Sequence, residues 1–137
     1  MLYPVAIDTG DDSTAFGVAV PDVPGCFSAG DSLDEAMANA KEALEMHLEA
    51  LAESGQLPPE ASNVKDHINN QEYAGWVWAL VEIDTEPYMG KASKINVTLP
   101  DLLTRKIDDL VGSNRSYKSR SHFLQVAASH ELQKATA

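Results

Sequence analysis

In the stretch Ser93-Lys94-Ile95-Asn96-Val97-Thr98-Leu99-Pro100, residues 94–99 alternate polar and apolar without a break. Because successive side chains of a β-strand point to opposite faces, the alternation predicts a strand over residues 93–99 with one apolar and one polar face. The apolar face comprises Ile95, Val97 and Leu99, and the polar face comprises Lys94, Asn96 and Thr98. Pro100 and Asp101 favour a helix start, since proline fits the first turn and an acidic side chain complements the helix dipole there.

Two helices are predicted after this strand. The first has an apolar stripe and is expected to end at Gly112-Ser113-Asn114; the stripe comprises Leu102, Leu103, Ile107, Leu110 and Val111. Ser119 is placed to cap a second helix, from Arg120 to about Lys134. One strand and two helices cannot bury much of a core, and a lone strand leaves both of its edges unpaired. Two chains that pair their strands antiparallel, with four helices behind them, would solve both problems.

Such a paired ribbon predicts DNA binding. A two-stranded ribbon fits the major groove of B-DNA, and lysine, asparagine and threonine can all contact base edges there. We therefore expect the polar face, Lys94, Asn96 and Thr98, to contact operator DNA. Residues 93–134 resemble the ribbon-helix-helix fold, and the resemblance implies that this β-α-α segment is a dimerisation and DNA-binding domain. The alternative is an edge strand and two packing helices of one larger domain, which would leave the shared polar face unexplained.

A phosphate anchor is expected at the start of the second helix of this segment. The free backbone amides at a helix N-terminus bind phosphate oxygens and fix the register of a protein on DNA. The predicted anchor residues are Ser119, Arg120 and Ser121.

Charge is distributed unevenly along the chain. Residues 1–90 contain 17 aspartates and glutamates against two lysines and no arginine, a formal charge of −15. Residues 91–137 contain eight lysines and arginines against four acidic residues, a formal charge of +4. The acidic part would repel phosphate, whereas the basic part could approach it. We therefore predict two domains, residues 1–88 and 89–137, although acidic surfaces also serve solubility alone.

The first domain is predicted to be α+β, in the order β-β-β-α-(α)-β. Strands are expected at 2–8 and 14–20, with a short third strand before Asp31; Pro4 would place the first strand near a sheet edge. The spacing of Ser32 and Glu35 is typical of a capping box, and apolar periodicity predicts a helix that Gly55 ends. A short helix is predicted over 62–70, and the run 76–84 is long enough for a central strand.

The first domain resembles the HicB antitoxin family. The residues that carry the resemblance are Tyr3-Pro4-Val5, the run Pro21-Asp22-Val23-Pro24-Gly25-Cys26-Phe27-Ser28-Ala29-Gly30-Asp31-Ser32-Leu33-Asp34-Glu35-Ala36, Ala40-Lys41-Glu42-Ala43-Leu44, and the junction from Val81-Glu82-Ile83-Asp84 to Pro87-Tyr88-Met89-Gly90-Lys91. Ala19-Val20 stands where the family pattern has a bulkier residue before the proline. Family members have either a helix-turn-helix or a ribbon-helix-helix tail, and this tail resembles the second kind.

The resemblance implies a non-enzymatic antitoxin without a cofactor or a metal. It implies a partial RNase-H-like sheet that covers the active site of a HicA toxin, a small basic ribonuclease, and a tail that represses the operon. A domain of charge −15 is electrostatically suited to a basic RNA-binding partner. The candidate toxin-binding residues, chosen for the exposure of the motif beside the sheet edge, are Asp22, Gly25, Phe27 and Ser28. We expect a cytoplasmic dimer, or a tetramer if the first domains pair as well.

The sequence leaves three alternative functions. A metal-dependent nuclease would use Asp8, Asp11 and Asp12, but these lie in one turn, whereas two-metal chemistry needs carboxylates from several strands. Cys26 as a nucleophile would need a base from among four histidines, and a packed thiol is the simpler interpretation. A ligand-sensing repressor without a toxin would share the DNA-binding tail, and ligand-dependent operator affinity would distinguish it.

Overall fold

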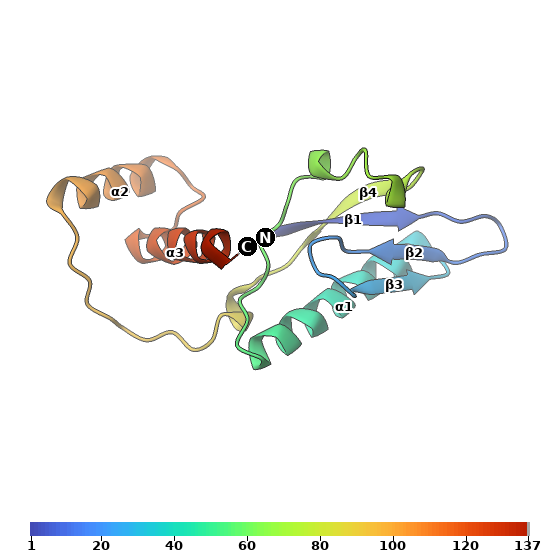
Figure 1. Cartoon of the computed structure of the whole chain (residues 1–137), viewed down its shortest axis with the longest axis horizontal. Helices are drawn as coiled ribbons and strands as arrows, with labels where there is room; N and C mark the ends of the chain where they lie inside the picture. Colours follow the sequence, from blue (N-terminus) through green and yellow to red (C-terminus); the bar gives the residue numbers. More distant parts are fainter. Residues whose placement is uncertain (137) are drawn as a thin grey trace. The chain divides into compact units, whose positions relative to one another are not determined.

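An antiparallel sheet of four strands, in the order β3-β2-β1-β4, organises residues 1–90 of the computed structural model, which describes residues 1–136 (Figure 1). The strands are β1 (Leu2–Asp8), β2 (Phe16–Ala19), β3 (Phe27–Gly30) and β4 (Val77–Glu82). Every neighbouring pair is antiparallel. The sequence therefore placed the strands correctly along the chain, with β2 and β4 shorter than predicted.

The order of the strands corrects two predictions. β1 lies inside the sheet although it contains Pro4, and β4 is an edge strand although its sequence favoured a central one. Met1 and Ile83 exchange both of their backbone hydrogen bonds, each at 2.8 Å, so in the alternating antiparallel ladder the pair Pro4–Leu80 is not hydrogen-bonded. The backbone nitrogen of Pro4 therefore points away from β4, toward the side of β1 that faces β2. Because β2 pairs with β1 only from Ala6 onward, no strand lies opposite Pro4 on that side.

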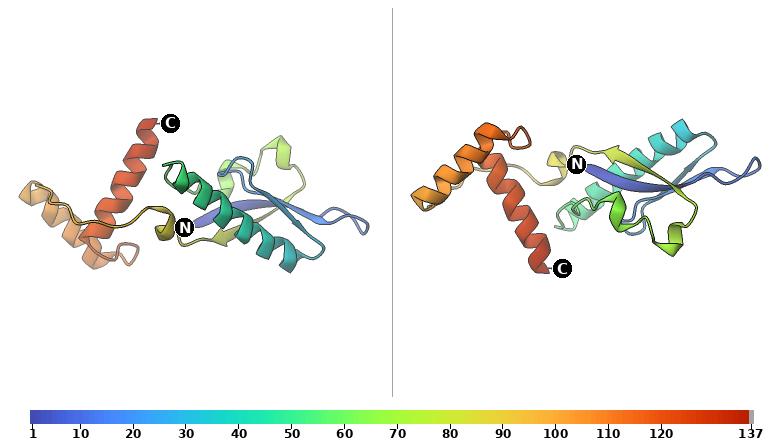
Figure 2. Two further views of the ribbon diagram at one scale, coloured as in Figure 1. Left: turned by 90° about the horizontal axis from the view of Figure 1, so that it is seen from below. Right: turned by 90° about the horizontal axis from the view of Figure 1, so that it is seen from above.

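One face of the sheet is covered by α1 (Leu33–Glu53), as predicted (Figure 2). The Ser32 side chain accepts a hydrogen bond from the Glu35 amide at 3.2 Å and caps the helix. A stripe of buried residues packs against the strands; it comprises Ala36, Ala40, Leu44 and Leu48. Gly30 passes so close to the Ala36 backbone that a Cβ atom would clash there, so glycine is required for α1 to pack on β3.

The other face is covered by the connection between α1 and β4 (Figure 2). The helix predicted over 62–70 is absent; instead there are two short 3₁₀ turns, η1 (Val64–Asp66) and η2 (Gln71–Tyr73). Nearby side chains accept hydrogen bonds from backbone N–H groups in place of helical carbonyls. The Asp66 carboxylate accepts from the Asn63 amide, and the Asn70 side chain accepts from the Glu72 amide. Trp78 of β4 stacks on His67 and meets Tyr73 edge-on, which fastens this connection to the sheet.

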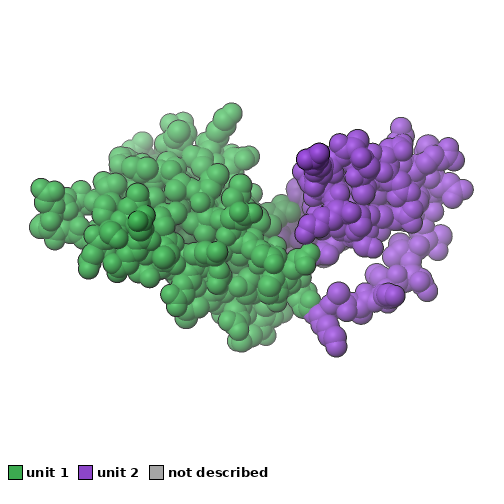
Figure 3. All heavy atoms as spheres, turned by 180° about the vertical axis from the view of Figure 1, so that it is seen from behind, with its two compact units in different colours: residues 1–90 green, residues 91–137 purple. Residues whose placement is uncertain are grey.

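The second unit, after Gly90 (purple in Figure 3), contains two helices, α2 (Asp101–Ser113) and α3 (Arg120–Thr136). The division lies close to the boundary predicted at residue 88. Residues 91–100 form no strand in the single chain and run as an open coil (Figure 1), because none of the described residues pairs with them. Among the described residues of this unit, Ile107 is the only buried apolar side chain. No helix within residues 1–136 combines the length and hydrophobicity of a membrane span.

Candidate functional site

The loop between β2 and β3 presents its tip to solvent while its flanks are held inside the domain. Val23 and Cys26 are 2% and 1% exposed, and backbone hydrogen bonds link Val23 to Val20 and Cys26 to Val23. Gly25, between them, has a φ of 84°, a left-handed conformation that favours glycine, and nothing lies within 4 Å of its Cβ position. The loop is therefore a fixed projection with Pro24 and Gly25 at its exposed tip.

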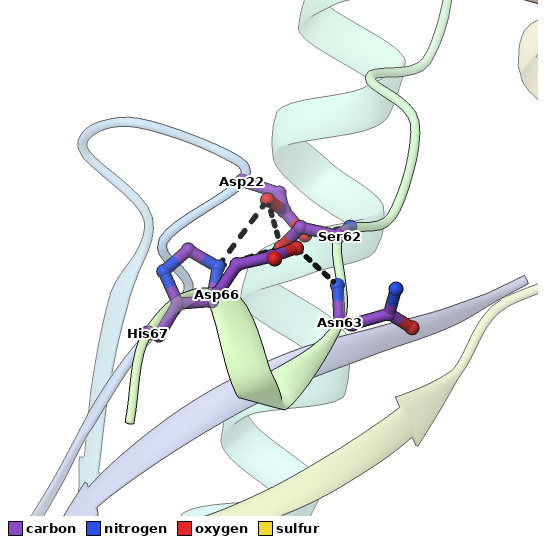
Figure 4. Close-up of polar contacts among 5 residues, drawn as sticks. All are labelled: Asp22, Ser62, Asn63, Asp66 and His67. Carbon is purple, nitrogen blue, oxygen red and sulfur yellow. Dashed lines mark hydrogen bonds and ion pairs between the residues drawn. The ribbon is translucent and has the colours of Figure 1, made fainter. Parts of the chain in front are cut away.

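Asp22 anchors this loop to the connection that covers the sheet (Figure 4). The Ser62 amide donates to Asp22 Oδ2 at 2.9 Å, and the Ser62 hydroxyl donates to Asp22 Oδ1 at 2.7 Å. His67 Nε2 lies 2.6 Å from Ser62 Oγ. Since the single hydroxyl proton of Ser62 is directed to the carboxylate, Nε2 acts as the donor in this second bond. We call these three residues the Asp22–Ser62–His67 network.

The network has the residue types of a hydrolase triad in the wrong order. In a triad the histidine accepts the serine proton, and the carboxylate orients the histidine through its other nitrogen. Here Asp22 binds Ser62 directly, and its Oδ1 is 3.9 Å from Nε2, the nitrogen that already faces the serine. Nothing in this arrangement activates Ser62 as a nucleophile, so the network positions the loop.

Tyr3 strengthens the same junction from β1. Its hydroxyl donates to the Pro59 carbonyl at 2.6 Å. Burial, together with the nearby negative charge of Asp22, raises the pKa of Tyr3 to about 12. The hydroxyl therefore stays protonated at neutral pH and holds the connection where it passes the end of the sheet.

The four candidate toxin-binding residues differ in their exposure. Phe27 is 68% exposed at the start of the edge strand β3, Gly25 is exposed, and Ser28 is half-buried. The Asp22 side chain is only 11% exposed, and both of its carboxylate oxygens are occupied by Ser62 (Figure 4). Three of the four thus reach the surface, while Asp22 acts on the loop from within.

The acidic hairpin turn and the lone cysteine lack the features of a catalytic centre. Asp8, Asp11 and Asp12 are exposed, and hydrogen bonds from Ser13 and Thr14 lower the pKa of Asp11, as expected of a solvated turn. Within residues 1–136, no group of three or more acidic, histidine or cysteine side chains could hold a metal ion. Burial raises the pKa of the Cys26 thiol, which opposes formation of the nucleophilic thiolate.

The predicted DNA-binding segment is a coil in the single chain, not the strand predicted over residues 93–99, and all of residues 93–99 except the half-buried Leu99 are exposed. Lys94, Asn96 and Thr98, which were predicted to form the polar face of a strand, are exposed. The apolar side chains Ile95 and Val97 are 79% and 58% exposed. Contiguous apolar surface left uncovered in this way is uncommon on folded monomeric proteins.

The start of α3 is ordered by side-chain bonds. The Ser119 hydroxyl accepts from the His122 amide at 3.0 Å and caps the helix, as predicted. The Arg120 guanidinium makes two hydrogen bonds to the Asp108 carboxylate, at 2.9 and 2.7 Å. This pair raises the pKa of Arg120 and lowers that of Asp108. Arg120, predicted as a phosphate contact, therefore braces α3 against α2 in the single chain, and Ser121 is exposed beside it.

Comparison with known proteins identifies the family. A family model described as the HicB-like antitoxin of bacterial toxin-antitoxin systems matches residues 3–128. The chain belongs to this antitoxin family. A Haemophilus phage HP1 protein, described as an uncharacterized 14.9 kDa protein in the rep-hol intergenic region, is 45% identical over 132 residues, 96% of this chain and 98% of that protein.

Two solved structures extend the similarity to the fold of this antitoxin. The crystal structure of the Burkholderia pseudomallei antitoxin HicB matches with a TM-score of 0.76 and 40% identity, over 96% of this chain and 98% of that chain. A chain of the HicA3 and HicB3 toxin-antitoxin complex matches with a TM-score of 0.53 and 32% identity, over 61% of this chain and 99% of that chain. The first similarity includes residues of both units.

Several residues that hold the β2–β3 loop and the start of α3 in the antitoxin were not among the sequence predictions. Ser62 and His67 fell in a stretch predicted as a helix, although its many Asn, Asp and Ser residues signalled local capping instead. The partner of Ser62, Asp22, is forty residues away in the sequence, and only the fold brings them together. The sequence gave no indication that Asp108 pairs with Arg120, because the pairing depends on the packing of α2 against α3.

Proposed function

We propose that this antitoxin neutralises a HicA-type ribonuclease toxin through residues 1–90 and represses its own operon through residues 91–137. The first half of the proposal is supported by the acidic charge of −15 on residues 1–90, which suits a basic RNA-binding partner. It is supported also by the complex of HicA3 with HicB3, whose matching chain covers 61% of this chain. Steric cover of the toxin's active site, with carboxylates in place of RNA phosphates, is the mechanism that this charge favours.

The toxin would meet the exposed end of the loop that the Asp22–Ser62–His67 network holds. Phe27 offers a large apolar contact at 68% exposure, and Gly25 lets a partner approach the backbone closely. Ser28 adds a hydroxyl beside them. Asp22 would contribute by fixing the loop, since its own carboxylate is already bonded to Ser62.

The observation that carries the DNA-binding half is the uncovered apolar row of residues 93–99. Ile95 and Val97 would be buried if two copies of this segment paired antiparallel, and the pairing would turn Lys94, Asn96 and Thr98 outward from the ribbon. That ribbon is the major-groove element of a ribbon-helix-helix dimer. The α3 N-terminus, at Ser119 and Ser121, would hold a phosphate. The RNase-H-like relationship of the sheet remains a prediction of the family resemblance.

A titration of the toxin encoded beside this chain, with RNA cleavage as the readout, tests the proposal. The full chain and residues 1–90 alone, which contain their own core, are expected to inhibit cleavage equally, while only the full chain binds operator DNA. Operator affinity should fall steeply with added salt, because the basic unit contacts phosphates. No inhibition by either protein, with operator binding intact, would remove the toxin from the proposal and leave a repressor.

A further inference from the structure

The ion pair between α2 and α3 occupies only one edge of the Arg120 guanidinium. Its Nε and Nη2 atoms each donate to an oxygen of the Asp108 carboxylate, at 2.9 and 2.7 Å. A guanidinium also has N–H groups along the edge that Nη1 shares with Nη2, and no described residue accepts a bond from that edge. Paired N–H groups of this kind match two oxygens of a phosphate. Arg120 can therefore keep Asp108 on one edge and take a phosphate on the other.

Folding stability alone is a poor reason for this pair. The side chains of Arg120 and Asp108 are 53% and 46% exposed, and exposed ion pairs contribute little because water screens them. Arg120 also lies in the first turn of α3, where the positive end of the helix dipole disfavours a cation. What the pair does fix is the direction of a long side chain that otherwise samples many rotamers. The pair thus orients the guanidinium more than it stabilises the unit.

The backbone beside the guanidinium is fixed as well. The Ser119 hydroxyl accepts from the His122 amide at 3.0 Å, and His122 Nδ1 accepts from the Lys118 amide at 3.1 Å. Among the described residues, no backbone or side-chain group accepts from the amides of Arg120 and Ser121. These two donors and the free guanidinium edge therefore belong to one turn, whose conformation is set before any ligand arrives.

We propose that Asp108 is a positioning residue for DNA binding, which holds Arg120 by one edge so that the other edge binds a backbone phosphate beside the α3 N-terminus. The inference rests on the proposed operator binding by residues 91–137 and adds to it a side chain that touches no DNA. Orienting the guanidinium in advance lowers the entropy lost when the phosphate binds. The pair lies within one chain, so each copy of a dimer would bring its own.

The charge of Asp108 gives the proposal a sign that can be measured. A carboxylate close to DNA repels phosphate, so charge alone predicts that Asp108 weakens binding. Positioning of Arg120 predicts the opposite, namely that Asp108 strengthens binding. The neighbouring Asp109 separates the two effects, because it is also exposed on α2 and its carboxylate has no hydrogen-bond partner among the described residues.

The test is a titration of Asp108→Asn and its matched control Asp109→Asn, each in the full chain, against a DNA duplex that covers the region upstream of the gene. Both variants remove one negative charge per chain. Asp108→Asn should bind about three- to tenfold more weakly. Its plot of log affinity against log salt should be shallower by about 2, since each copy in a dimer loses a phosphate contact. Asp109→Asn should bind at least as tightly as the unaltered chain, with the same slope.

Two further variants distinguish positioning from a merely structural brace. Weaker packing of α2 on α3 would lower the amount of folded dimer but not the number of phosphates contacted. The salt slope, measured where native mass shows a dimer, would then stay unchanged. In the background of Arg120→Gln, Asp108→Asn should cause no further loss, because Asp108 acts through Arg120. Asp108→Glu, which keeps the carboxylate, should recover most of the affinity.

The possible results separate this proposal from the operator function on which it rests. Tighter DNA binding by Asp108→Asn, or weaker binding with an unchanged slope, would overturn the proposal. Either result would leave the operator function standing, since the unaltered chain would still bind the duplex. Absence of binding by the unaltered chain would instead contradict the operator function, and the proposal would fall with it.

Discussion

The two units of the antitoxin bury very different amounts of their own apolar surface. Residues 1–90 contain a closed core in which Tyr3, Leu44 and Leu48 are fully buried. Of the described residues after Gly90, only Ile107 is a buried apolar side chain, while Ile95, Leu102 and others are more than half exposed. The first unit is a complete domain by itself. The second has the composition of a half-domain, whose core would form between two chains.

Placing a charge on the apolar row of residues 95, 97 and 99 should have the largest effect. If it had no effect, the contrast drawn between the two units would be wrong. Val97→Lys would bury a lysine between the paired strands and the helices behind them, so self-association of the second unit should be lost and operator affinity should fall about a hundredfold or more. Native mass and a DNA-binding titration measure both. Thr98→Lys, its neighbour on the polar face, should retain the native mass. Equal behaviour of the two variants would mean that this segment does not pair.

A cavity in the closed core should destabilise the first unit alone. Leu44→Ala removes a fully buried side chain beneath the sheet and should lower the free energy of unfolding of this unit by about 2–5 kcal/mol. Met46→Ala, on the same helix at 63% exposure, should change it by less than about 0.5 kcal/mol. Urea unfolding followed by tryptophan fluorescence isolates this unit, because both tryptophans, Trp76 and Trp78, belong to it. Comparable effects of the two substitutions would contradict the assigned core.

Removing one base contact should separate the two proposed activities. Asn96→Ala should cost about 1–3 kcal/mol in operator affinity and relax sequence specificity, since asparagine can make a paired hydrogen bond to adenine. Inhibition of the toxin should be unchanged, because residue 96 lies outside the acidic unit. Gel-shift titration beside the RNA-cleavage assay tests this. If both activities fell together, the division of labour between the units would be wrong.

The smallest effect is expected at the junction that holds the loop. Ser62→Ala removes the hydroxyl that donates to Asp22 Oδ1 and should lower the unfolding free energy of the first unit by about 1–2 kcal/mol. Ser54→Ala, whose hydroxyl bonds only the exposed end of α1, is the matched control. Weaker toxin binding by Ser62→Ala, with Ser54→Ala unaffected, would show that loop position matters for recognition. No difference between the variants would reduce the network to a minor surface contact.

Sequence patterns predicted elements whose signals are local and missed those that depend on distant partners. The capped α1 and the two C-terminal helices follow from the spacing of a few neighbouring residues. The positions of β1 and β4 within the sheet were wrong, because strand order depends on which strands meet rather than on their composition. At the site, the motif led to the loop, but the inward direction of Asp22 depends on Ser62, which joins it only in the folded chain.

The pairing of β1 with β4 delays completion of the sheet while the antitoxin is being synthesised. Leu2 pairs with Glu82, and Ile7 with Val77, so this side of β1 stays open until a ribosome has added the whole of β4. At about 5–20 residues per second, translation leaves the strand without that partner for roughly 4–16 seconds. A chain that ended inside this interval would lack β4, and this side of β1 would stay unpaired. If the first unit neutralises the toxin as proposed and needs its complete sheet to do so, only chains translated past residue 83 would protect the cell.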